Sequence, residues 1–116
     1  MFRLTLLVAA LAAAVFLASA QAATVRLTGE VGPGFSIEVN KAGKDVKTLR
    51  AGKYRIKVED KSSIHNFHLI GPGVNKMTSV GFVGKQTWTV TLKKGRYAYQ
   101  CDPHAAGGMK GSFSVR

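Results

Sequence analysis

The chain has 116 residues, with 17 lysines and arginines against 6 acidic residues, which gives a formal net charge of +11. This length suits one small domain with one core. The basic residues are spread along the chain rather than bunched, which argues against nucleic-acid binding as the reason for the charge.

The first 22 residues have the features of a cleaved secretory signal peptide. Arg3 supplies a positive charge, residues 4–17 form an apolar stretch interrupted only by a threonine, and small residues follow. We expect cleavage after Ala22, with Ala20 as the competing site. An uncleaved membrane anchor is the alternative, but the apolar stretch is shorter than the roughly 18 residues that a spanning helix needs. The protein is therefore predicted to be exported, and to be periplasmic or secreted.

The remaining residues, 23–116, are predicted to form one domain with a formal charge of +10. They contain the only cysteine of the chain, Cys101, which therefore cannot form a disulfide within the chain. An unpaired thiol in an oxidising compartment needs a ligand that occupies it or a partner that covers it. A bound metal ion is the simpler explanation.

This domain is predicted to be all-β, with the architecture of a single two-sheet Greek-key β-sandwich. Apolar and polar residues alternate along seven short runs, and turns rich in glycine separate them. The runs cover residues 24–28, 35–39, 54–59, 64–69, 87–92, 96–101 and 112–116. The turns cover residues 32–34, 42–44, 51–53, 71–73 and 93–95. One short helix or irregular stretch is expected around residues 75–78.

Strand alternation predicts which candidate metal ligands point into the sandwich. His65 shares a face with two apolar residues of its run, whereas His68 falls on the other face together with Asn66. Cys101 shares the inner face of its own run with two tyrosines. His65 is therefore the better ligand, and His68 is expected to be a solvent-exposed or loop residue.

The segment that begins at Cys101 supplies two more candidate ligands, His104 three residues later and Met109 a further five residues on. A thiolate, two imidazoles and a distant thioether form the set that selects copper and lets it carry one electron. Zinc prefers four strong ligands in tetrahedral geometry, and a thioether is a poor fourth. A catalytic cysteine–histidine pair would leave the methionine unexplained. The sequence therefore predicts one copper ion held by His65, Cys101, His104 and Met109.

These residues resemble the cupredoxins, the small type 1 blue copper proteins, and most closely the plastocyanins. The likeness rests on His65-Asn66 before an apolar strand and on the run Tyr-x-Tyr-x-Cys-x-Pro-His-x-x-x-x-Met-x-Gly. Azurins have a longer spacing in that loop. The resemblance implies that His65, Cys101 and His104 are the strong ligands and that Met109 is a weak axial one.

Two further residues are expected to tune the copper site. Asn66 would tie the two ligand segments together, and its backbone amide could donate a hydrogen bond to the sulfur. Pro103 has no N–H, so a second donor to the sulfur is missing. His68 and Met77 could provide an additional copper-handling site, although such residues are more often solvated or packed.

A neutral patch of small residues is expected around His104, where a redox protein would dock and exchange electrons through the imidazole. The patch is predicted to contain Pro33, Pro72, Ala105, Ala106 and Gly107. The basic charge would attract a partner with an acidic surface, or allow association with an anionic envelope surface. The acidic patches and the exposed tyrosine of plant plastocyanins are absent, with Gln100 at the tyrosine position, so no photosynthetic role is assumed.

The sequence thus predicts an exported, monomeric type 1 copper protein that transfers single electrons between redox partners. It is not expected to be an enzyme, or to bind nucleic acid or a small-molecule substrate. The first alternative is a copper carrier or resistance protein in which metal transfer is the role. The second is a sandwich module that binds a protein partner and carries an inert thiol.

Overall fold

The computed structural model describes residues 10–15 and 24–116 of the chain. The predicted signal peptide, residues 1–22, lies for the most part outside the described residues, so its cleavage stays a prediction. Within the described part of the chain, no helix is long and apolar enough to cross a membrane.

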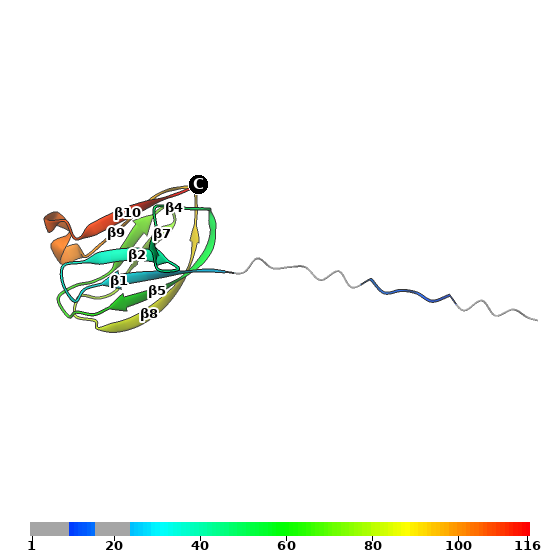
Figure 1. The fold of residues 1–116 in the computed structure, drawn as a ribbon, viewed down its shortest axis with the longest axis horizontal. Helices are drawn as coiled ribbons and strands as arrows, with labels where there is room; N and C mark the ends of the chain where they lie inside the picture. Colours follow the sequence, from blue (N-terminus) through cyan, green and yellow to red (C-terminus); the bar gives the residue numbers. More distant parts are fainter. Residues whose placement is uncertain (1–9, 16–23) are drawn as a thin grey trace, which may run out of the picture.

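The domain consists of two five-stranded sheets packed face to face (Figure 1). The first sheet has the order β3-β2-β1-β5-β8, from β1 (Val25–Val31), β2 (Ile37–Lys41), β3 (Lys44–Asp45), β5 (Gly52–Asp60) and β8 (Gly84–Leu92). The second has the order β4-β10-β9-β6-β7, from β4 (Thr48–Leu49), β6 (His68–Gly71), β7 (Val74–Met77), β9 (Gly95–Gln100) and β10 (Lys110–Val115). A short 3₁₀-helix, η1 (Asp102–Gly107), joins β9 to β10. The predicted all-β sandwich is confirmed.

The core between the sheets follows the alternation seen in the sequence. Along β1, Leu27 and Val31 are buried while Arg26 faces solvent. Gly29 lies on the same inner face, where a Cβ atom would come within 2.7 Å of the Phe67 ring. The missing side chain therefore makes room for an aromatic ring in the centre of the sandwich, close to the segment that carries His65.

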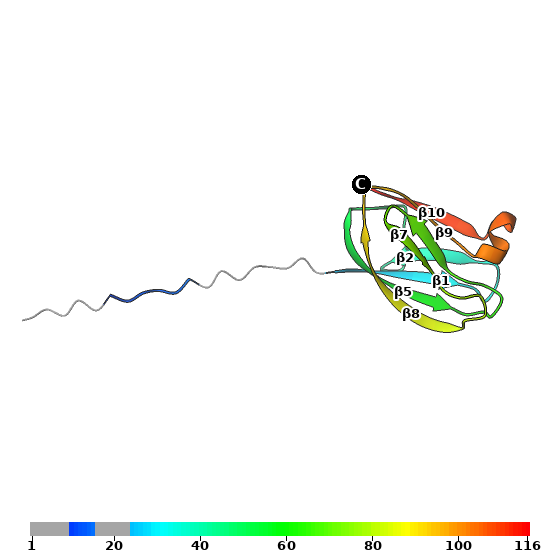
Figure 2. The same cartoon turned by 180° about the vertical axis from the view of Figure 1, so that it is seen from behind.

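Strand direction determines which loops meet at each end of the sandwich. β1, β5, β7 and β9 all run toward the end that carries η1, which we call the η1 end (Figures 1 and 2). The loops gathered there cover residues 32–36, 61–67, 78–83 and 101–109. The turns at the opposite end, the far end, cover residues 42–43, 50–51, 72–73 and 93–94.

Two local predictions are corrected. The strand expected over residues 64–69 begins only at His68, because the chain first forms a turn in which the His65 amide bonds the Ser62 carbonyl at 3.4 Å. Residues 75–78 were expected to be helical or irregular, yet most of them belong to β7, which pairs with β6 at the edge of the sheet. Strand pairing with β6 therefore overrides the weak local pattern of this segment.

The place of the turn at residues 71–73 is also corrected. We expected it beside the turn at residues 32–34, but it lies at the far end, because β6 runs away from the η1 end. There the Pro72 carbonyl accepts a hydrogen bond of 2.7 Å from the Tyr97 hydroxyl. Pro72 therefore does not belong to a surface around His104.

Candidate metal centre

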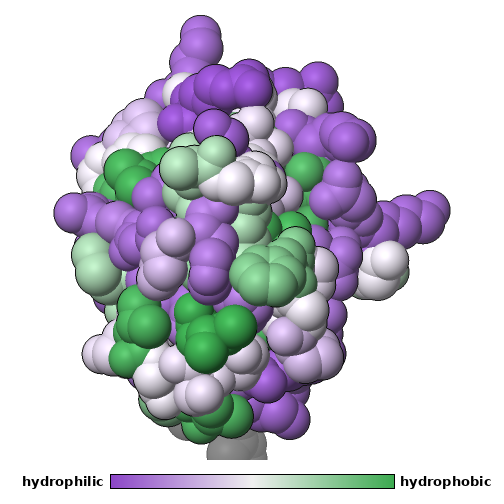
Figure 3. Space-filling model, turned by 90° about the vertical axis from the view of Figure 1, so that its left-hand side faces the viewer, coloured by the Kyte–Doolittle hydropathy of each residue, from purple (hydrophilic) through white to green (hydrophobic). Residues whose placement is uncertain are grey.

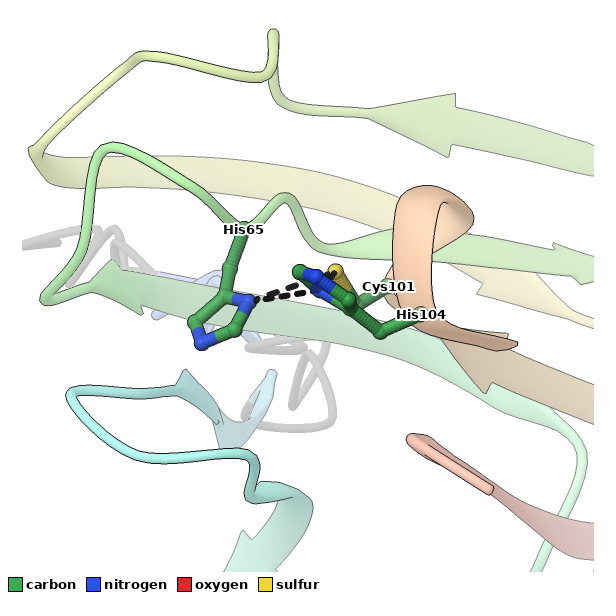
Figure 4. A group of neighbouring side chains, drawn as sticks. All are labelled: His65, Cys101 and His104. Atoms are coloured by element: carbon green, nitrogen blue, oxygen red, sulfur yellow. Dashed lines mark hydrogen bonds between the residues drawn. The ribbon is translucent and has the colours of Figure 1, made fainter. Parts of the chain in front are cut away.

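Three of the four predicted ligands meet at the η1 end of the sandwich (Figure 4). His65 comes from the loop between β5 and β6, Cys101 follows β9, and His104 lies in η1. His65 Nδ1 is 3.0 Å from His104 Nδ1 and 3.6 Å from Cys101 Sγ. His104 Nδ1 is 3.4 Å from the same sulfur. Among the described residues, these three form the only such group able to hold a metal ion.

The triangle of donor atoms has the size that a single ion requires. A point equidistant from its three corners lies about 1.9 Å from each, close to the roughly 2.0–2.3 Å bonds that nitrogen and sulfur donors make to such metals. His65 and Cys101 are both 0% exposed, so both lie within the folded core. His104 is only partly buried, which gives the centre one ligand at the surface.

The local geometry of η1 explains the spacing of Cys101 and His104. Residues three apart lie on the same side of a 3₁₀ turn, so both side chains face one point. The His104 amide bonds the Cys101 carbonyl at 3.1 Å and closes this turn. Pro103 fits the start of the helix, where a missing N–H costs nothing. Gly108 ends the helix in the left-handed conformation, with φ of +99°.

Met109, the fourth predicted ligand, is buried directly after this loop. Its carbonyl accepts a hydrogen bond of 3.1 Å from the Cys101 amide, and its own amide bonds the His104 carbonyl at 3.2 Å. Met109 also lines a pocket together with Pro103, His104 and Phe35. The backbone thus closes the segment from Cys101 to Met109 into a ring, which keeps Met109 beside His104.

Asn66 joins the two ligand segments through three hydrogen bonds. Its Oδ1 accepts from the Asp102 amide at 2.7 Å, and its Nδ2 donates to Asp102 Oδ2 at 2.9 Å and to the Thr78 carbonyl at 3.2 Å. Asn66 is only 2% exposed, whereas strand alternation predicted it on the outer face. The prediction is wrong because residues 65–67 precede β6 and do not follow its alternation.

Asp102 is the centre of a polar cluster outside the metal site. Its Oδ1 receives hydrogen bonds of 2.8 Å from both Gln100 and His68. Burial alone would raise the pKa of Asp102, but the hydrogen bonds from Gln100, His68 and Asn66 outweigh it and lower that pKa. The other ring nitrogen of His68 lies 2.6 Å from Asn75 Oδ1. Both nitrogens of His68 are therefore engaged, which weakens its case as part of an additional copper site.

Phe35 is a site residue that the sequence reasoning missed. It was included in the strand predicted over residues 35–39, but it precedes β2 and is 71% exposed. Its ring packs edge-on against both imidazoles, with centroid distances of 4.9 Å to His104 and 5.3 Å to His65. The sequence signal that could have indicated this role is the position of Phe35 directly after the Gly-Pro-Gly turn. Phe35 therefore covers the histidine pair on its solvent side.

Other exposed apolar side chains gather at the same end. Ile64, Val80 and Val83 lie in loops of the η1 end, and apolar patches interrupt the hydrophilic surface there (Figure 3). The η1 end also carries the expected Pro33, Ala105, Ala106 and Gly107. The surface around His104 is thus more apolar than the small residues alone predicted.

Comparisons with known proteins identify the family. A model of copper-binding proteins of the plastocyanin/azurin family matches residues 20–116. The chain belongs to this family. The cupredoxin prediction is thereby confirmed, and His65, Cys101 and His104, with Met109 nearby, form a type 1 copper site.

Solved structures of other copper proteins show the same fold. Reduced rusticyanin is 26% identical over 84% of this cupredoxin and 82% of its own chain, with a TM-score of 0.60. Rusticyanin from Thiobacillus ferrooxidans is 25% identical over 83% and 79% of the two chains, with a TM-score of 0.58. Auracyanin from the photosynthetic bacterium Roseiflexus castenholzii, at 22% identity over 83% and 99% and a TM-score of 0.57, is similar in fold alone. No curated protein matches the chain in sequence.

Proposed function

We propose that this cupredoxin is an exported electron carrier that passes single electrons between redox partners and catalyses no substrate chemistry. The observation that carries the proposal is the contrast between its ligands. His65 and Cys101 are completely buried, whereas His104 reaches the surface beside an exposed aromatic ring. A buried centre with one surface ligand suits electron exchange, because an electron can leave through the imidazole while the ion stays in place.

The protein's contribution is to hold its donors still. Copper bound between them supplies a one-electron Cu(II)/Cu(I) couple. His65 and Cys101 are fixed by the core, and the hydrogen bonds of Asn66 keep their two segments in register. Donors that cannot rearrange keep the geometry similar in both oxidation states, so little reorganisation accompanies electron transfer.

The docking surface is proposed to be the apolar η1 end around His104. Phe35, Ile64, Val80 and Val83 add exposed apolar area to the predicted patch of small residues. The excess of basic residues supports attraction of a partner with an acidic surface, or of an anionic envelope surface, by a force that weakens with salt.

Phe35→Ala should slow electron exchange with such a partner several-fold. Ile70→Ala, which removes an exposed apolar residue from β6, should leave the rate unchanged.

A copper carrier is the second candidate, and redox cycling against a chelator separates the two. An electron carrier loaded with Cu(II) turns intensely blue, bleaches on reduction and regains the colour on reoxidation, while the chelator removes little Cu(I). A copper carrier gives up Cu(I) readily and has no stable blue Cu(II) form. The burial of His65 and Cys101 favours the first outcome.

Export is proposed from the N-terminal sequence. The family match supports the copper site rather than the compartment. Expression of the full chain in a bacterium with a periplasm tests the proposal. We expect a processed protein that begins at Ala23 in the exported fraction, as determined by mass spectrometry, and an unprocessed cytoplasmic chain would contradict it.

A further inference from the structure

Two buried polar atoms near the copper site have no hydrogen-bond partner among the described residues. They are Oδ2 of Asp60 and Nε2 of His65. Asp60 is 1% exposed, so water does not freely satisfy its carboxylate. Folded proteins pair nearly all such groups, and each exception calls for an explanation. The two groups are complementary, because a carboxylate oxygen accepts a hydrogen bond and an imidazole N–H donates one.

The orientation of His65 directs Nε2 away from the other ligands. Its Nδ1 faces Cys101 and His104, and the second ring nitrogen lies on the opposite side of the ring (Figure 4). When Nδ1 binds a metal ion, the proton of the neutral imidazole must be on Nε2. The bound state therefore creates a buried N–H donor on the side of the ring that faces away from Cys101 and His104.

Asp60 belongs to the same neighbourhood. Its Oδ1 accepts a hydrogen bond of 3.0 Å from the Ser62 amide, which leaves Oδ2 for another donor. A Cβ atom at Gly32 would lie 3.2 Å from Ser62 Cβ and 3.3 Å from Cδ2 of His65, the carbon bonded to Nε2. Gly32 thus lies close to both the Ser62 turn and the Nε2 edge of the ligand. The Asp60 turn and this edge of His65 meet across one glycine.

Charge supports the same pairing. Burial raises the pKa of Asp60, and the hydrogen bond from the Ser62 amide opposes that rise. The ion pairs of the described residues involve other acids, namely Glu30, Asp45, Glu59 and Asp102, so Asp60 has no lysine or arginine partner there. Nε2 of His65 is the other buried polar side-chain atom without a hydrogen-bond partner among the described residues, and it is the complementary group for this carboxylate.

We infer that Asp60 is a positioning residue of the copper site, whose carboxylate accepts the His65 Nε2–H hydrogen bond directly or through one water. A carboxylate behind a metal-bound imidazole fixes its tautomer and orientation and makes it a stronger donor. The negative charge also favours Cu(II) over Cu(I), which lowers the reduction potential. This inference rests on the proposed copper function, because the donor proton is placed by metal binding at Nδ1.

Asp60→Asn tests the inference with almost no change in shape. It keeps an acceptor oxygen and removes the charge. We expect a higher reduction potential and about tenfold weaker binding of Cu(II), with little change for Cu(I). Glu59→Gln is the matched control, because it removes the same charge one residue away on the outer face of β5. A folded Asp60→Asn protein with the potential and Cu(II) affinity of the wild type would overturn the inference.

A second measurement needs no variant at Asp60 and separates this inference from the proposed function. In the wild-type protein loaded with Cu(I), nitrogen NMR reports the proton on His65 Nε2 and its exchange with water. We expect a slowly exchanging, hydrogen-bonded proton, and a rapidly exchanging one would overturn the role of Asp60. A copper carrier would also bind Cu(I), so this result stands even where reversible blue colour, and with it the electron-carrier function, fails.

Discussion

The two ends of the sandwich contain the same tripeptide in different roles. Gly32-Pro33-Gly34 lies at the η1 end, where Gly32 leaves room for the ring of His65. Gly71-Pro72-Gly73 lies at the far end, where the Pro72 carbonyl accepts the Tyr97 hydroxyl hydrogen bond and the Lys93 amide donates to that hydroxyl at 3.0 Å. The first turn packs beside a metal ligand, and the second is hydrogen-bonded to a buried tyrosine of the core. The direction of the adjoining strands, rather than the turn sequence, decides which task each performs.

The comparison predicts that substitutions at the η1 end change copper binding and that substitutions at the far end do not. Cys101→Ser at the η1 end should abolish the blue colour completely, because the thiolate is the soft ligand responsible for it. The fold should remain, since serine is close to cysteine in size. Pro72→Ala at the far end should keep the full colour. Visible absorption with circular dichroism checks both variants, and colour in the Cys101→Ser protein would show that the ligand assignment is wrong.

Removing a side chain that forms hydrogen bonds should lower stability at either end of the sandwich. Copper affinity should fall only when the change is at the η1 end. Asn66→Ala leaves the Asp102 amide and the Thr78 carbonyl without their partner, so we expect a loss of about 3 kcal/mol in the free energy of unfolding. Copper affinity should fall as well, because the ligand segments lose their link. Tyr97→Phe at the far end should cost about 1 kcal/mol and leave copper affinity intact. Denaturant unfolding and copper titration measure both, and equal copper affinity in the two variants would contradict the account.

Matched glycine substitutions sharpen the contrast further. Gly71→Ala places a methyl group against the Tyr97 ring, so overpacking should cost about 1–3 kcal/mol without changing the copper spectrum. Gly32→Ala imposes a side chain at a φ of +76° and against His65, which should cost about 1–2 kcal/mol and shift the spectrum. Thermal unfolding and visible absorption of the two proteins provide the readouts. A shifted spectrum in Gly71→Ala alone would reverse the assignment of the two ends.

The smallest expected effect is the pH dependence of the Asp102 cluster. Because folding lowers the pKa of Asp102 below its ordinary 3.8, the ionised carboxylate stabilises the native state. This contribution is fully present above pH 3.8 and is lost as the pH falls through the lower, folded value. The stability difference between wild type and Asp102→Asn, measured by unfolding at several pH values, should therefore shrink in acid. A difference that grows as the pH falls would give the opposite sign.

The sequence predicts the sandwich and the Cys101, His104 and Met109 part of the ligand set because these depend on short-range patterns. Alternation places Leu27 and Val31 in the core, and the spacing from Cys101 to His104 is one turn of η1. A methionine five residues further on then falls beside the same loop. Such features are encoded within a few neighbouring residues, so they can be read without knowing the topology.

Features that depend on where strands begin and run escaped prediction. Asn66 was assigned to the outer face, and Phe35 to a strand, by extending strand alternation into residues that lie outside the strands. Pro72 was predicted to lie near His104 together with Pro33. Which end of the sandwich a turn occupies depends instead on the directions of the strands that it joins. The inferred pairing of Asp60 with His65 would join the end of β5 to a later loop, and no local pattern in the sequence indicates it.

The most direct test of the account is a Cu(II) titration of the mature protein followed by visible absorption. We predict an intense blue thiolate-to-copper band that rises linearly and stops at one copper ion per chain. This result requires His65, Cys101 and His104 to bind the same ion, as their donor atoms within 3.6 Å of one another indicate. Copper uptake without that band, or no uptake at all, would contradict the central claim.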